Sequence, residues 1–379
     1  MLKQLRIHNY RSFVNFEWVP PRSGVLVGEN GAGKTSVLDA LWLLRELVVE
    51  GKMATDAGWP GTRTTWTPEG PQTIEVHWEH DAERFHYRVD LQSSGRHGEL
   101  REELRSGDEL LYRAEGGKVD LFGDAPTAQP RTTIDYHKTR SFLAALQARQ
   151  DNRRVTRFRA LLENTWFIRP DPPRIGDLAE GEAHWLEPDL SNFAAWYLAK
   201  SPSDFGATEK LHRRLRETIA GFAELRLEPV SSEAKELRVK FAFGVSGSSD
   251  GSIGHELRWR QLSDGQRLLI ALYGVLHLGL PTANLILLDE VENYVAPSEI
   301  QPWLSAVTDL AADQNQQVLV VSHHPEAINY LAADSVWRMW RDRAEGFSRI
   351  SPMEIDLDAG VTAYDVLKLG AEDAGPNPV

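Results

Sequence analysis

The chain of 379 residues contains no cysteine, which excludes disulfide bonds and metal sites built on thiolates. It also has no apolar run near the length of about eighteen residues that a membrane-spanning helix needs. The first residues lack the pattern of a signal peptide. We therefore expect a cytoplasmic protein with no membrane partner.

An excess of positive charge is missing as well. Lys and Arg number 42 against 55 Asp and Glu, which gives a formal net charge of −13. This balance argues against indiscriminate binding to nucleic acid, because contacts to phosphates depend on the local density of Lys and Arg. A local basic groove is compatible with it, so DNA stays a candidate partner. The length of 379 residues suggests one large or two moderate domains, and a hydrophobic content of 41% fits a globular protein.

The most informative segment that is present is GENGAGKT at 28–35, which fits the phosphate-binding pattern G-x-x-x-x-G-K-[ST]. The glycines let the backbone turn its N–H groups onto phosphate oxygens. Lys34 is expected to reach the β and γ phosphates, and the Thr35 hydroxyl to hold Mg²⁺. The residues predicted to contact ATP here are Gly28, Asn30, Gly31, Ala32, Gly33, Lys34, Thr35 and Ser36.

The context of this segment supports the prediction. A buried strand is expected at 24–27, and a helix with one apolar stripe at 36–49. The loop then delivers phosphates to a helix N-terminus, where the dipole and the N–H groups favour anions. A chance glycine-rich turn is the alternative interpretation.

A second apolar strand, at 284–288, runs into Asp289 and Glu290. Strands this apolar are typical of the centre of a parallel sheet, and the carboxyl edge of such a sheet binds ligands. Asp289 is predicted to hold Mg²⁺, and Glu290 to orient or deprotonate the attacking water. Two solvated acids at a strand end are the alternative.

A third apolar strand, at 316–321, ends in Ser322-His323-His324. A histidine at this edge is suited to contact the γ-phosphate, and His323 is the preferred candidate of the two. A structural histidine is the alternative.

Segment 262–266, LSDGQ, resembles the signature motif of ABC-type ATPases, and an apolar helix at 268–280 follows it as in that family. The opening LRIHNYRSF at 5–13 and the Glu-Asn pair at 292–293 resemble AAA family ATPases of the RecF, SMC and OLD-like branch. Many of these are encoded in bacterial defence systems. The resemblance implies an α/β fold: a P-loop NTPase with an ABC-type ATPase head, an antiparallel β block and a helical insertion.

The resemblance also implies roles for matching positions. Ser263 and Gly265, with Gln266 beside them, would contact the γ-phosphate held by another subunit, so that ATP joins a homodimer. Glu290 would be the catalytic base and His323 the switch histidine. The sequence departs from the family where VENYVAP at 291–297 replaces a Pro-Glu-Asn-x-x-His-Pro run.

Two more departures concern the middle of the chain. A glutamine is expected after the strand at 164–168, but Arg169-Pro170-Asp171 stands there, and Asp171 is a weak candidate to replace it at the metal. No long heptad coiled coil interrupts the ATPase halves, so we expect no full SMC arm.

The expected organisation has four parts. An ATPase lobe at 1–135 carries the phosphate loop and the antiparallel sheet, and a mainly helical insertion or lid follows at 136–235, with helices at 138–163 and 188–222. A second ATPase lobe at 236–355 carries a strand at 237–243, a flexible Gly/Ser-rich loop at 244–254 and the remaining motifs. A C-terminal tail occupies 356–379.

We predict an ATP-hydrolysing ABC-type ATPase that dimerises on ATP and drives or gates a partner protein or a DNA transaction, in anti-phage defence or DNA repair. The alternative is an ATP-held scaffold that sequesters a nuclease or toxin effector, with hydrolysis incidental. Glu290 favours the first, since a pure scaffold need not retain a base. Arg258 and Arg260 are candidates for the dimer interface, and the basic helical stretches 153–159 and 213–216 for a solvated face or a partner surface.

Overall fold

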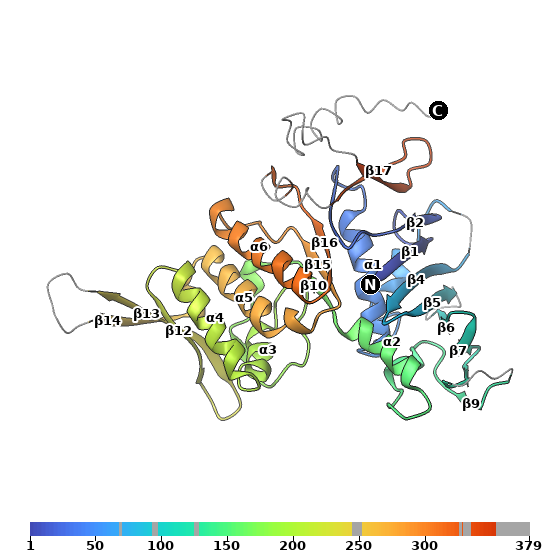
Figure 1. Cartoon of the computed structure of the whole chain (residues 1–379), viewed down its shortest axis with the longest axis horizontal. Helices are drawn as coiled ribbons and strands as arrows, with labels where there is room; N and C mark the ends of the chain where they lie inside the picture. Colours follow the sequence, from blue (N-terminus) through green and yellow to red (C-terminus); the bar gives the residue numbers. More distant parts are fainter. Residues whose placement is uncertain are drawn as a thin grey trace. The chain divides into compact units, whose positions relative to one another are not determined.

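The computed structural model describes residues 1–67, 70–92, 98–124, 129–244, 252–325, 328 and 335–353. The chain forms two compact units (Figure 1). Unit 1 comprises Met1–Thr165 and the segment that begins at Gln317, and unit 2 comprises Trp166–Gln316. The boundaries of these two units differ from the boundaries of the four segments expected from the sequence. The tail at 356–379 lies outside the described residues.

An antiparallel sheet of eight strands dominates unit 1. Its strands are β1 (Leu2–His8), β2 (Phe16–Trp18), β4 (Gln72–His80), β5 (Glu83–Gln92), β6 (Glu99–Ser106), β7 (Glu109–Glu115), β8 (Lys118–Leu121) and β9 (Thr132–Asp135). Their order is β2-β1-β4-β5-β6-β7-β8-β9. The expected antiparallel block is therefore confirmed, and it also includes β1, β2 and β9.

One face of this sheet is covered and the other carries polar side chains. The side chains of Val76 and Tyr87 are fully buried, as the period of two along a strand requires. Helix α2 (Arg153–Glu163) packs on that buried face, where the Phe158 ring lies 5.7 Å from the Phe85 ring and 5.0 Å from the Tyr87 ring. The expected helix at 138–163 is shorter than predicted, with α2 preceded by a short 3₁₀ turn, η2 (Phe142–Ala144).

The other strands of unit 1 surround the phosphate-binding segment. They are β3 (Ser23–Gly28), β16 (Gln317–Val321), β17 (Val336–Arg341) and β18 (Ser348–Met353). Strand β3 lies between β16 and β17 and is parallel to both, and β18 is antiparallel to β17. Helix α1 (Lys34–Val48) follows β3 and is buried on most of its circumference, which is typical of a helix packed inside a fold.

Unit 2 combines helices with shorter strands. The helices are α3 (Phe193–Lys200), α4 (Phe205–Thr218), α5 (Asp264–Leu278) and α6 (Pro297–Asp313). The strands are β10 (Thr165–Ile168), β11 (Leu178–Ala179), β12 (Phe222–Pro229), β13 (Lys235–Gly244), β14 (Ser252–Arg258) and β15 (Leu285–Asp289). Strand β13 pairs antiparallel with β11, β12 and β14. Unit 2 also contains the short 3₁₀ turns η3 (Pro172–Arg174), η4 (Trp259–Gln261) and η5 (Leu280–Thr282), and unit 1 contains η1 (Trp59–Thr62).

Two expectations for this part of the chain need correction. The stretch 188–222, expected to be helical, contains two helices, α3 and α4, and residue 222 already begins β12. The stretch expected as a loop at 244–254 ends in a strand, because β14 begins at Ser252; residues 245–251 lie outside the described residues.

Helix α5 is the centre of unit 2. It packs against α4 (Figure 1), where the Arg214 guanidinium lies 5.7 Å from the centre of the Tyr273 ring. On the α6 side, the buried Trp303 indole N–H donates to the Leu272 carbonyl at 2.9 Å.

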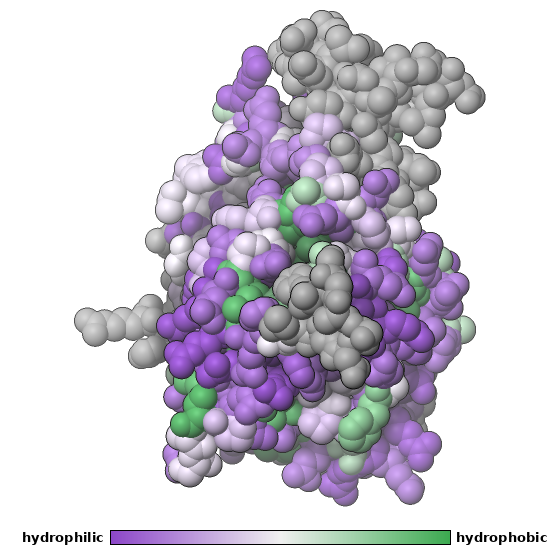
Figure 2. Space-filling model, turned by 90° about the vertical axis from the view of Figure 1, so that its left-hand side faces the viewer, coloured by the Kyte–Doolittle hydropathy of each residue, from purple (hydrophilic) through white to green (hydrophobic). Residues whose placement is uncertain are grey.

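Among the described residues, hydrophobic side chains on the face drawn in Figure 2 form only small separate patches. No helix in the described part of the chain is both long and apolar enough to cross a bilayer.

Candidate functional site

The phosphate loop, residues 28–35, connects β3 to α1 in a conformation that needs glycine. Gly28, Gly31 and Gly33 have φ angles of 148°, 81° and 106°, values that side-chain-bearing residues rarely adopt. A Cβ atom on Gly28 would lie 2.1 Å from the Met339 carbonyl oxygen, and one on Gly33 would lie 2.8 Å from the Ser348 hydroxyl. At Gly31 a Cβ would meet no atom within 4 Å. The loop is thus packed against the fold at both ends and open at its middle.

Lys34 supplies a positive charge at the same place. Its ammonium donates to the carbonyls of Gly28 and Glu29, at 2.8 and 3.0 Å. The residue that caps α1 is Gly33, which has no side chain to bond the first N–H groups of the helix. A fixed cation beside a helix N-terminus is an arrangement that binds phosphate.

Residues outside the loop hold it in place. The Arg11 guanidinium donates to the Ser36 hydroxyl at 3.0 Å and also pairs with Asp39. The Ser348 hydroxyl donates to the Ala32 carbonyl at 2.6 Å and lies 2.6 Å from the Ser12 hydroxyl. Sequence reasoning missed these contacts. The opening segment resembled a family motif, but Ser348 carried no signal, because its approach depends on the pairing of β17 with β18.

His323 follows the strand that is parallel to β3. Val321, the last residue of β16, pairs with Leu26 of β3, so both strands end at the same edge of unit 1. The Ser322 hydroxyl is fully buried and accepts from the N–H of His324 at 3.0 Å. His323 is exposed and His324 is half-buried. The sheet therefore brings His323 to the edge from which the phosphate loop departs, and its contact with nucleotide stays a prediction.

The acid pair belongs to unit 2. Every residue of β15 is buried, including Asp289, which is 2% exposed. Glu290 follows with a φ of 51°, a left-handed conformation that costs energy for a residue other than glycine and is common at functional sites. The Asn293 side chain donates to the Glu290 carboxylate at 3.1 Å. The turn after β15 thus fixes the Glu290 carboxylate through the asparagine of the Glu-Asn pair.

The LSDGQ segment forms the start of α5. Ser263 is the N-cap, and its hydroxyl accepts from the N–H of Gln266 at 3.2 Å. In return, the Gln266 side chain accepts from the N–H of Ser263 at 3.1 Å. This capping box stabilises the helix start. Ser263 is exposed, and by helix geometry the N–H groups of Asp264 and Gly265 lack acceptors inside the helix.

Strand β10 confirms the strand expected before the missing glutamine. Beyond it, Arg169 and Asp171 donate their backbone N–H groups to the carbonyls of Pro188 and Asp189, at 2.8 and 3.3 Å. The Arg169 guanidinium lies 5.3 Å from the centre of the Phe167 ring. The segment is thus held by its backbone, and a metal contact from Asp171 stays a prediction.

Acids accompany the basic residues singled out in the sequence. Arg154 and Arg157 of α2 both pair with Glu83, at 2.5 and 2.8 Å. Arg260 is 81% exposed but bonds Asp177 at 2.9 Å. These pairs favour a solvated face for α2, and a dimer contact of Arg258 and Arg260 stays a prediction.

The predicted site residues fall into two sets. Unit 1 holds Gly28, Asn30, Gly31, Ala32, Gly33, Lys34, Thr35, Ser36 and His323; unit 2 holds Ser263, Gly265, Gln266, Asp289 and Glu290. The structure brings the first set to one edge of unit 1. In unit 2 it places the acid pair at the end of β15 and the LSDGQ residues at the start of α5.

Two family models match the chain. A family model described as "AAA domain, putative AbiEii toxin, Type IV TA system" matches residues 25–329, and a second AAA-domain model matches residues 4–44. Comparison with curated proteins finds no match.

Among solved structures, the chain is similar to an SMC head bound to the C-winged helix domain of ScpA, with a TM-score of 0.56, 13% identity and coverage of 95% of this chain and 99% of that chain. It is also similar to an SMC head with an extended coiled coil, bound to the C-terminal domain of ScpA from Pyrococcus furiosus. That match has a TM-score of 0.52, 12% identity and coverage of 99% of both chains. The expected α/β fold of an ABC-type ATPase head is therefore confirmed.

Proposed function

The chain belongs to the family of AAA domains whose model matches residues 25–329, and we propose that it binds ATP with Mg²⁺ and hydrolyses it. The observation that carries this proposal is the phosphate loop. Its glycines adopt positive φ angles, its lysine ammonium is held at the loop, and a buried helix begins where the loop ends. These groups suit a triphosphate because they offer backbone donors, a cation and a helix dipole together.

Each remaining motif has a role in this proposal. Thr35 and Asp289 supply oxygen ligands for Mg²⁺, which prefers such ligands and keeps several waters. Glu290 accepts a proton from, or orients, the water that attacks the γ-phosphate. His323 senses the γ-phosphate. The left-handed backbone of Glu290 and its bond from Asn293 support the catalytic role, because strained and positioned carboxylates are typical of active sites.

We further propose that ATP joins two copies of the chain. In this arrangement, the start of α5 in one copy contacts the γ-phosphate held by the loop of the other. Ser263 is exposed at the N-terminus of a long buried helix, and Gly265 follows it in the first turn. A helix start of this kind binds anions through its N–H groups, and it supports a contact made by Ser263, Gly265 and Gln266.

The cycle of ATP binding and hydrolysis then gates a partner. The family description names a putative toxin of a type IV toxin–antitoxin system, which supports a role in a defence system. In this proposal the partner is a toxin or nuclease effector. The similar SMC head is bound to a winged-helix domain, which supports protein binding by a head of this fold. DNA is a second candidate partner.

The test of ATP binding is the variant Lys34→Ala. Loss of the cation should weaken ATP binding by at least about tenfold, in the range expected for a lost charged hydrogen bond, and hydrolysis should fall with it. Calorimetry with ATP·Mg²⁺ measures the affinity. Lys118→Ala, at an exposed lysine of the same unit, is the matched control. An unchanged affinity in Lys34→Ala would remove this lysine from the phosphate site.

A further inference from the structure

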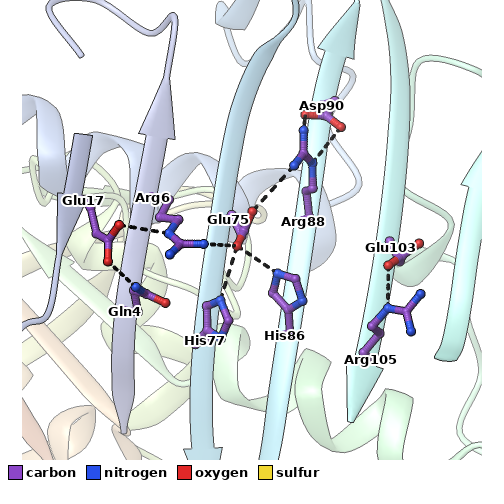
Figure 3. Close-up of polar contacts among 10 residues, drawn as sticks. All are labelled: Gln4, Arg6, Glu17, Glu75, His77, His86, Arg88, Asp90, Glu103 and Arg105. Carbon is purple, nitrogen blue, oxygen red and sulfur yellow. Dashed lines mark hydrogen bonds and ion pairs between the residues drawn. The ribbon is translucent and has the colours of Figure 1, made fainter. Parts of the chain in front are cut away.

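A cluster of metal-ligand side chains lies on the polar face of the eight-stranded sheet. Glu75 and His77 are two residues apart on β4 and therefore point to the same face. His86 stands directly opposite His77 on β5. The three side chains converge in Figure 3, and one ligand atom from each lies within 4.8 Å of the other two.

The distances within the cluster suit a single ion. Nε2 of His77 lies 3.3 Å from Oε1 of Glu75, and Nε2 of His86 lies 3.0 Å from the same oxygen. Ligands bound tetrahedrally at about 2.0–2.1 Å from a zinc ion are about 3.3–3.4 Å apart. The two imidazole rings are stacked, with centres 4.3 Å apart, so both nitrogens meet the carboxylate from the same side of the sheet.

The nitrogen of His86 has an unusual environment. Nε2 is buried, and its 3.0 Å contact with Oε1 of Glu75 does not have the geometry of a hydrogen bond. A buried polar atom without a hydrogen bond is costly. A metal ion bound by this nitrogen and by Glu75 would remove that cost.

Two arginines also approach Glu75. The Arg6 guanidinium is 3.4 Å from Oε1, and the Arg88 guanidinium is 3.7 Å from Oε2. Each has a second carboxylate: Arg6 reaches Glu17 at 3.2 Å, and Arg88 makes two 3.0 Å bonds to Asp90. These bonds are drawn in Figure 3. Three carboxylates therefore oppose two guanidinium groups, so with neutral imidazoles the cluster attracts a cation.

An open hollow of about 530 Å³ lies beside the cluster, and both histidines line it. Lys3, which pairs with Glu79 at 2.9 Å, lies on its wall, as do Arg84 and Asp108. The hollow provides an entry path for an ion and leaves room for a water molecule as a further ligand. Sites with three protein ligands and one exchangeable position have this arrangement.

We propose that Glu75, His77 and His86 bind one divalent transition-metal ion of the zinc, nickel or copper class. Two imidazole nitrogens and one carboxylate form a donor set that suits these ions, whereas Mg²⁺ and Ca²⁺ prefer oxygen ligands only. The ion would join neighbouring strands β4 and β5 through their side chains. The site is separate from the phosphate loop in sequence and in ligand chemistry, so it does not depend on the proposed ATPase function.

The test is a titration of the full chain, without an affinity histidine tag and without nucleotide, with zinc chloride followed by calorimetry. We expect one saturable site per chain. In Glu75→Gln and in His86→Gln the affinity should fall by at least about 100-fold, since even residues that only support a metal ligand change affinity by 10–100-fold. Cobalt bound to the wild type should show the visible spectrum of a low-coordinate site with nitrogen and oxygen ligands, and this spectrum should be lost in both variants.

His80→Gln is the matched control. His80 lies on the same strand, and its side chain is 36% exposed against 37% for His77. This variant should bind zinc like the wild type. Melting curves in the presence of a chelator check that each variant is folded, and Glu75→Gln and His86→Gln each serve if the other does not fold. Absence of a saturable site in the wild type, or an unchanged affinity in a folded Glu75 or His86 variant, would overturn the proposal.

Discussion

Gly28 lies against Met339 so closely that no side chain fits between them. Strands β3 and β17 pair in parallel at these two residues, and a Cβ atom on Gly28 would lie 2.1 Å from the Met339 carbonyl oxygen. The first glycine of the phosphate loop is thus required by the sheet as well as by the loop conformation. The same contact connects nucleotide binding to the folding of unit 1.

Gly28→Ala should therefore destabilise the protein by about 1–3 kcal/mol more than Gly31→Ala does, because a forced contact adds to the strained backbone, and it should weaken ATP binding. Gly31→Ala is the control, because its Cβ would meet no atom within 4 Å and only the positive φ costs energy, about 1–2 kcal/mol. Urea denaturation measures both. Equal stability of the two variants would show that β3 and β17 do not approach each other in this way.

Glu290→Gln should retain ATP binding and slow hydrolysis by about 10²–10⁴, the usual contribution of a positioned base. Glutamine keeps the size of the side chain and an acceptor for the Asn293 amide, so the turn after β15 should persist. Single-turnover assays measure the rate. Glu299→Gln, at an exposed acid of the same unit, should hydrolyse ATP normally. Near-normal turnover in Glu290→Gln would assign activation of the water to another group.

Much of the fold was predictable from the sequence because its signals are local. The strand at 24–27 and the glycines of the loop predict β3 and its turn. Apolar residues alternate with polar ones at 74–78 and again at 85–89, which predicts β4 and β5. The helical stretch expected at 188–222 was wrong in its detail. Pro202 and the N-cap Asp204 are local signals for the break between α3 and α4, whereas the start of β12 at Phe222 depends on its pairing with β13.

Contacts between distant segments could not be predicted. Ser348 reaches the Ala32 carbonyl only because β18 pairs with β17. The cluster of Glu75, His77 and His86 needs the register of β4 and β5, and a shift of one residue would turn His86 to the other face. The spacing of Glu75 and His77 was the only local sign of it.

His277 on α5 should make stability depend on pH. Burial, followed by the charges of Arg214, Lys210 and Arg213, lowers the pKa of His277 to about 4, below the usual value of about 6.5. In the unfolded chain His277 therefore binds a proton below about pH 6.5, whereas in the folded protein it binds one only below about pH 4. The contribution of His277 to the free energy of unfolding is complete above about pH 6.5 and falls as the pH is lowered from 6.5 to 4.

His277→Gln should remove this dependence. Between pH 7 and pH 5 the wild type should lose roughly 1–2 kcal/mol more stability than the variant, after allowance for partial exposure. Chemical denaturation at both pH values measures the difference. His80→Gln, which replaces a half-buried histidine, should follow the wild type. Parallel losses in the wild type and His277→Gln would contradict a depressed pKa at this position.

We propose that ATP joins two copies of the chain through the start of α5. Ser263→Arg should block this contact by bulk, abolish hydrolysis, and leave ATP binding at the Lys34 loop largely intact. It also removes the N-cap hydroxyl, a loss of about 1 kcal/mol. Ser263→Ala shares that loss without the bulk and is the control for helix stability. Normal hydrolysis by Ser263→Arg would leave LSDGQ as an ordinary helix start.

The most direct measurement is the mass in solution by light scattering of Glu290→Gln protein with ATP, with ADP and without nucleotide. A ligand bound only by the associated form shifts the equilibrium by about 2.7 kcal/mol at 100 times its dissociation constant. ADP lacks the γ-phosphate that the second copy would contact. We predict a dimer with ATP, and a smaller mass with ADP and without nucleotide. The same mass in all three conditions would contradict the account.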